Sequence, residues 1–116
     1  MTDAAGFDFE QAVRDALDDL PGEFRDAMSN VTVVVEEEPP AGAPLLGLYQ
    51  GVPLTRRTSS YQGALPDKIT IYSGPLERLY GADVELLRGQ VRHVVWHEVA
   101  HHFGISDERL VELGRY

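Results

Sequence analysis

The last third of the sequence contains one helical pattern that is long enough to cross a small domain. Apolar residues recur every four positions after Asp83, a suitable N-cap, and the pattern ends at Gly104. A helix over this stretch would be about 30 Å long at ~1.5 Å per residue. Its apolar stripe consists of Leu87, Val91, Val95, Val99 and Phe103. We expect this helix to form one wall of the hydrophobic core.

The segments before this helix predict a sheet and a second helix that packs against it. Apolar residues have helical spacing from Asp8 to Leu20. Strands are expected at 31–35, 45–49 and 68–72, and shorter helices after Pro21, at 75–80 and after Ser106. Residues 52–66 lack periodicity and are typical of a long surface loop. The order predicts one α+β domain over residues 1–116, with a three- to four-stranded sheet packed on the N-terminal helix and the long helix.

Within the long helix lies the motif HExxH, from His97 through Glu98 to His101. Two His side chains four residues apart lie one turn apart on the same face, so both imidazoles can reach one metal ion. Glu98 is rotated about 100° from His97, so its carboxylate can approach a metal-bound water without being a ligand. The motif alone would arise by chance in roughly one such chain in a hundred, so it needs further support.

The residues after the motif supply a candidate for a third ligand. A catalytic zinc site uses three protein ligands and one open position. Gly104 can reverse the chain through a positive φ, and Asp107 then falls where its carboxylate can approach both imidazoles. Asp107 would also suit the first turn of a helix without any metal. Glu108 is the first alternative for the third ligand, and Glu112 is the second.

The full pattern, HExxHxxGxxD, resembles the active-site segment of a bacterial family of minimal zincin-like metallopeptidases. The matching segment here is HEVAHHFGISDERLVELG, and the similarity extends to LLGLYQGVPLTRR, LPDKITIYSGP and the acidic N-terminal helix. The resemblance implies a small α+β zincin fold with one zinc ion on His97, His101 and Asp107. It also implies that Glu98 is the catalytic base and that peptides or proteins are the substrates.

Zinc and Glu98 together predict peptide hydrolysis. Zinc lowers the pKa of its bound water towards ~7, and Glu98 would accept the proton of that water and pass it to the leaving amine. Candidates for a second donor to the oxyanion are Tyr49, Tyr61, Tyr72, Tyr116, Arg56 and Arg57. In zincins generally, substrate pairs with a sheet edge beside the active-site helix. By that analogy Ile69–Tyr72 would be the edge, with Ile69 and Tyr72 binding substrate, and the alternative is a core strand.

Two further histidines lie close to the motif. His93 shares a face with His97 and His101, but it is about 12 Å from His101 along the axis, too far for both to bind one ion. We therefore expect His93 to be packed or hydrogen-bonded behind the site. His102 points about 100° away from His101, which favours a structural role.

The charge distribution argues against a nucleic-acid partner. The net charge is -9, and residues 1–38 hold eleven acidic residues but only two basic ones. No dense basic surface for phosphate is present in the sequence. No stretch has the ~18–20 apolar residues of a membrane span, and the N-terminus lacks the pattern of a signal peptide. We expect a cytoplasmic protein without a membrane partner, monomeric by default.

The main alternative to a peptidase is a catalytically silent zincin-fold module for binding or regulation. In that case the metal would be structural, closed by a fourth protein ligand such as Glu108. The presence of Glu98 favours the peptidase, since a purely structural site needs no base. A metal-dependent nuclease is disfavoured by the charge balance.

Overall fold

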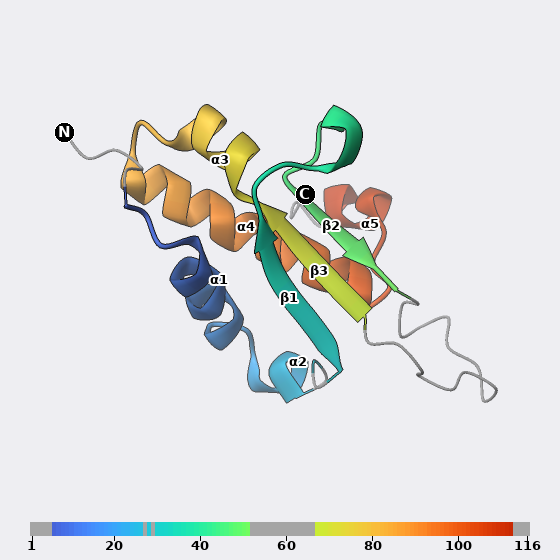
Figure 1. The fold of residues 1–116 in the computed structure, drawn as a ribbon. Coiled ribbons are helices and arrows are strands. Elements are labelled where there is room, and N and C mark those ends of the chain that lie inside the picture. Colours follow the sequence, from blue (N-terminus) through green and yellow to red (C-terminus); the bar gives the residue numbers. More distant parts are fainter. Residues whose placement is uncertain (1–5, 27, 29, 52–66, 113–116) are drawn as a thin grey trace.

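The computed structural model describes residues 6–26, 28, 30–51 and 67–112. Within these ranges the chain forms a small sheet with helices, as predicted for an α+β fold (Figure 1). The predicted loop at 52–66 lies outside the described residues. None of the helices in these ranges combines the length and the apolar composition that crossing a bilayer requires.

In the described part of the chain, three strands form the sheet in the order β1-β3-β2. The central strand β3 (Asp67–Tyr72) pairs in parallel with β1 (Val31–Glu36) and antiparallel with β2 (Gly47–Gln50). β1 is rich in β-branched residues, which fit the extended, pleated backbone well. Each strand begins and ends within two residues of its predicted bounds.

The expectation that Ile69 and Tyr72 lie at a substrate-binding edge is wrong. Their strand, β3, is flanked on both sides, and their side chains are 0% and 2% exposed, respectively. The alternative of a core strand therefore holds. The alternation of residues 68–72 indicated a buried face, but it gave no information on which strand occupies the centre. The edge strand nearest the motif is β2, because β2 lines the same cleft as the motif residues.

The helices also follow the sequence pattern closely. A short 3-10 turn at Pro40–Gly42 separates β1 from β2. The α-helices are α1 (Phe9–Asp18), α2 (Gly22–Asp26), α3 (Ser73–Tyr80), α4 (Val84–His102) and α5 (Asp107–Glu112). The Asp83 carboxylate caps α4 by accepting hydrogen bonds from the N–H groups of Glu85 and Leu86, at 3.0 and 3.3 Å.

The core lies between the sheet, α1 and α4. α4 crosses behind the sheet with α1 packed beside it (Figure 1). Trp96 fixes this pairing, because its Nε1–H donates to the Ala16 carbonyl at 2.8 Å. The buried apolar side chains are Phe9, Ala12, Val13, Ala16, Leu20, Ile69, Ile71, Leu76, Leu87, Val91, Val94, Val95 and Val99. This packing holds α4 rigidly, so side chains on its last turns have fixed positions.

Candidate metal centre

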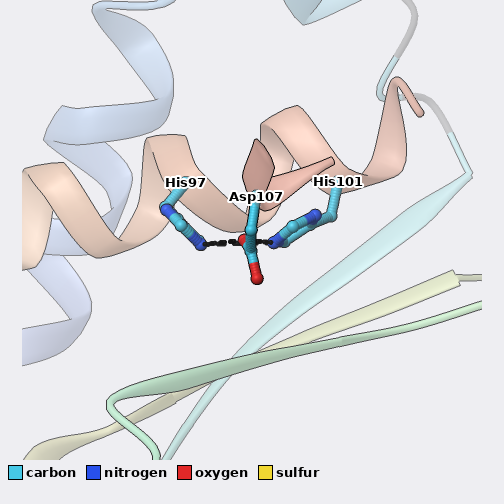
Figure 2. Close-up of side chains that lie close together, drawn as sticks. All are labelled: His97, His101 and Asp107. Atoms are coloured by element: carbon cyan, nitrogen blue, oxygen red, sulfur yellow. Dashed lines mark hydrogen bonds and ion pairs between the residues drawn. The ribbon is translucent and has the colours of Figure 1, made fainter. Parts of the chain in front are cut away.

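Two turns at the C-terminal end of α4 and the first residue of α5 bring three side chains together. The Nε2 atoms of His97 and His101 are 3.2 Å apart. Asp107 Oδ1 lies 3.2 Å from the first and 3.0 Å from the second. Figure 2 shows the two rings and the carboxylate pointing at one place. Among the described residues, these three form the group that could hold a metal ion.

The chain reversal between α4 and α5 places Asp107. Gly104 has φ of +84°, a left-handed conformation that glycine adopts at little cost. Two main-chain hydrogen bonds close the turn, from Gly104 N–H to the His101 carbonyl and from Ile105 N–H to the Ala100 carbonyl, both at 2.9 Å. Ser106 Oγ then accepts a hydrogen bond from the Arg109 N–H at 3.1 Å and caps α5, whose first residue is Asp107.

The surroundings of both imidazoles favour metal binding. His101 Nδ1 lies 3.0 Å from the Ile105 carbonyl oxygen, which can only accept a hydrogen bond. Nδ1 therefore donates to this carbonyl, and Nε2 is the ring nitrogen that faces Asp107 and is placed to bind a metal. Burial lowers the pKa of His97, and the neighbouring His101 lowers it further, which favours the neutral ring that binds a metal.

The spacing of the three ligand atoms fits a tetrahedral ion. Bonds of ~2.0–2.1 Å to zinc place two tetrahedral ligand atoms about 3.3 Å apart. The observed separations of 3.0–3.2 Å are close to that value. Two imidazole nitrogens and one carboxylate oxygen are also a donor set that zinc accepts. The residues present therefore fit zinc.

Glu98 lies beside this group with its side chain largely buried, at 8% exposure. Burial raises the pKa of the Glu98 carboxyl above its ordinary value. The Tyr49 backbone N–H donates a hydrogen bond to this carboxyl, which opposes the shift. Glu98 is therefore held between α4 and β2 as a more basic carboxylate than an exposed glutamate.

A cleft of about 570 Å³ opens over these side chains. Its lining includes Leu45 and residues 47–49 of β2, and residues 104–107 from the turn after α4 and the start of α5. His97, Glu98 and His101 of α4 also line it. An extended ligand in this cleft would contact both the metal group and the edge strand β2.

The sequence profile of zincin-like metallopeptidases matches residues 28–115, which include the whole cleft and all three strands. The chain belongs to the zincin-like metallopeptidase family. A search of curated proteins found no match to this chain. The family assignment agrees with the geometry, because zincins bind their metal through two histidines of one helix, as His97 and His101 are placed here.

The other two histidines and the candidate oxyanion donors lie outside the group of His97, His101 and Asp107. His93 is exposed rather than packed behind the site, with its ring centroid 6.2 Å from that of His97. His102 is buried, as a structural role requires. The Tyr49 hydroxyl donates to Asp67, and Tyr72 is buried, so neither supplies an oxyanion donor to the cleft. The remaining oxyanion candidates, Arg56, Arg57, Tyr61 and Tyr116, lie outside the described residues.

Sequence reasoning missed two features of this family member. Gly47 allows β2 to approach α4 at Glu98, and Asp67 pairs with His102 although 35 positions separate them. A glycine within a strand can signal close backbone approach, so Gly47 was a detectable signal. No local pattern connects Asp67 with His102, because the sheet and the helix bring them together only in the folded chain.

Gly47→Ala is expected to lower the free energy of unfolding by about 1–3 kcal/mol, because the added methyl has no room. A Cβ atom there would lie 2.7 Å from Val94 Cγ1 and 3.3 Å from both Glu98 Cγ and the Thr70 carbonyl oxygen. Gly89→Ala is the matched control, since a Cβ at this α4 position meets nothing within 4 Å. The control should gain about 0.5–1 kcal/mol from helix propensity. Equal urea midpoints for the two variants would contradict the close approach of β2 to α4.

Proposed function

We propose that this protein is a zinc-dependent peptidase that hydrolyses peptide bonds in the cleft between β2 and α5. The observation that carries the proposal is the convergence of His97, His101 and Asp107 at 3.0–3.2 Å, with Glu98 beside them. Membership of the zincin-like metallopeptidase family supports it. In this proposal the three converging residues hold one zinc ion. When bound, zinc would polarise the scissile carbonyl and acidify a water molecule.

Glu98 acts as the general base in this proposal. Its carboxylate takes the proton from the attacking water and delivers it to the leaving nitrogen. Burial raises the pKa of Glu98, which brings its basicity nearer to that needed at neutral pH. The hydrogen bond from the Tyr49 N–H orients the carboxylate, so the base does not have to be ordered during the reaction.

The substrate lies extended along the outer edge of β2. Tyr72 N–H donates to the Leu46 carbonyl, and antiparallel ladders alternate between bonded and non-bonded pairs. The backbone groups of Gly47 and Tyr49 therefore point away from β3, towards the cleft. Because Glu98 takes the Tyr49 N–H, the Gly47 backbone and the Tyr49 carbonyl are the groups that would pair with a peptide.

The alternative of a binding module with a structural metal has less support. Such a site needs a fourth protein ligand, and the metal-binding group found among the described residues has three members. Glu108, the fourth ligand suggested by the sequence, is exposed and outside that group. Three ligands leave one coordination position for water or substrate, as a peptidase requires.

Zinc-dependent cleavage of an unfolded protein such as reduced, alkylated casein tests the proposal. We expect a chelator to abolish cleavage and one equivalent of zinc to restore it, because the reaction needs the ion and its single site. Glu108→Gln is the control variant and should keep full activity, since Glu108 lies outside the metal group. Cleavage that survives chelation would sink the proposal, and so would inactivity of the zinc-loaded protein on casein and on a peptide library.

A further inference from the structure

A second polar cluster is buried behind the candidate metal centre. Asp67 and His102 are each 1% exposed, and His102 Nδ1 lies 2.8 Å from Asp67 Oδ2. The Tyr49 hydroxyl donates to the same oxygen at 2.6 Å. Since a carboxylate oxygen only accepts, His102 Nδ1 carries the proton. We call Tyr49, Asp67 and His102 the buried polar cluster, and it joins β2, the start of β3 and the last residue of α4.

The buried polar cluster lies directly beside Glu98. Glu98 and His102 are four residues apart, so their side chains lie on the same face of α4. On β2, the missing side chain of Gly47 leaves room for Glu98 Cγ, and the Tyr49 ring is 5.7 Å from the His102 ring. The N–H of Tyr49 donates to the Glu98 carboxyl. Tyr49 of β2 therefore contacts Glu98 through its backbone N–H. Through its hydroxyl, the same residue contacts Asp67 and His102.

Stability alone does not explain a polar cluster at this position. His102 Nε2 is buried without a hydrogen-bond partner among the described residues, which carries a desolvation cost. Buried ionic or polar pairs can often be replaced by apolar side chains of similar volume with little loss or even a gain of stability. Hydrogen bonds, however, fix distance and direction more narrowly than apolar contacts do. The buried polar cluster is therefore suited to setting a position.

We propose that the buried polar cluster holds β2 at the distance from α4 at which the Tyr49 N–H meets the Glu98 carboxylate. His102 and Asp67 are positioning residues, since they act on Glu98 through Tyr49 and do not face the cleft. The consequence of this positioning for hydrolysis rests on the function proposed above. The positioning itself does not depend on that function, because it concerns contacts within the metal-free chain.

Amide hydrogen exchange of residue 49, measured by NMR on the metal-free full chain, tests the proposal. This N–H points away from β3, and Glu98 is the acceptor that protects it. His102→Leu keeps the side-chain volume but loses the donor, whereas His102→Asn loses volume but keeps an N–H donor near the Nδ1 position. We expect exchange at residue 49 to be about tenfold faster in His102→Leu and close to wild type in His102→Asn.

Three further measurements make the result unambiguous. Glu98→Ala removes the acceptor, so it gives the exchange rate that the residue 49 amide has without its hydrogen bond. Tyr49→Phe removes only the hydroxyl and should accelerate exchange at residue 49 as His102→Leu does. The Ile71 amide in the centre of the sheet reports global opening, so the ratio of the rates at residues 49 and 71 is the readout. A ratio that stays at the wild-type value in His102→Leu, or rises only in His102→Asn, would overturn the proposal.

Activity assays separate this inference from the proposed function. If the protein is a peptidase, His102→Leu should lower kcat about tenfold with unchanged zinc affinity, and His102→Asn should restore kcat. Zinc affinity is unchanged because the Ile105 carbonyl, not the buried polar cluster, orients His101. If wild type proves inactive, the proposed function fails while the exchange measurement still decides whether the cluster positions Glu98.

Discussion

Zinc affinity is expected to fall by more than about 100-fold when His97 is replaced by alanine. Loss of a group that merely orients a ligand already costs ~10–100-fold, so loss of a ligand costs more. His97 Nε2 lies 3.2 Å from both His101 Nε2 and Asp107 Oδ1, so its removal leaves only two of the three converging groups. Competition with a chromophoric chelator at pH 7 measures the change.

His93→Ala is the matched control for this loss. His93 lies one turn earlier on α4, is exposed and is outside the metal-binding group. Its replacement should leave zinc affinity within about twofold of wild type, since it removes no ligand. Equal losses in His93→Ala and His97→Ala would show that the helix, and not the ligand set, had been disturbed.

The third ligand is tested by comparing Asp107→Ala with Glu108→Ala. Both residues lie in the exposed first turn of α5, so the two changes disturb the helix N-terminus similarly. Only Asp107 has an oxygen within 3.2 Å of both imidazoles. Asp107→Ala should therefore weaken zinc binding as strongly as His97→Ala, and Glu108→Ala should not. The reverse result would move the third ligand to Glu108.

Glu98→Gln is expected to lower kcat by about 10²–10⁴-fold while zinc affinity stays near the wild-type value. General base catalysis contributes an effect of that size, and the amide cannot accept a proton from water. Glutamine still accepts the Tyr49 N–H through its carbonyl oxygen, so the local structure is retained. Proteolysis of casein and zinc titration, run on the same preparations, separate the two effects. Full activity in this variant would exclude Glu98 as the base.

In the metal-free state, the Glu98→Gln variant should unfold at a higher temperature than wild type. Burial raises the pKa of Glu98 above its ordinary value of 4.5, so the folded state binds this proton more tightly than the unfolded state. The ionised carboxylate therefore costs stability, increasingly as the pH rises above about 4.5 and up to the folded pKa. Glutamine avoids that cost at pH 7. A stability difference independent of pH would contradict this explanation.

The candidate metal centre was predictable from the sequence because it is local. His97 and His101 are one turn apart on a helix whose apolar stripe is unambiguous, and Gly104 marks where that helix reverses. Asp107 follows within three residues of the turn. Helical geometry and glycine conformation therefore predict the approximate arrangement of these three side chains without any knowledge of the sheet.

The sheet and its contacts with α4 were less predictable because they depend on pairing between distant segments. The alternation at β3 is the same for an edge strand with one buried face as for a central strand, so Ile69 and Tyr72 were misplaced. The short distance between Asp67 and His102 follows from the packing of α4 on β3 and β2, which brings the last residue of α4 to the first residue of β3. Neither feature leaves a periodic signal.

In the proposed function, three side chains of this chain bind one ion and leave one position open. A crystal structure of the zinc-loaded protein tests it most directly. We predict one ion bonded to His97 Nε2, His101 Nε2 and an oxygen of Asp107, with a water molecule as the remaining ligand and Glu98 within hydrogen-bond reach of that water. A fourth protein ligand in place of the water, or an ion bound away from the two imidazoles, would contradict the account.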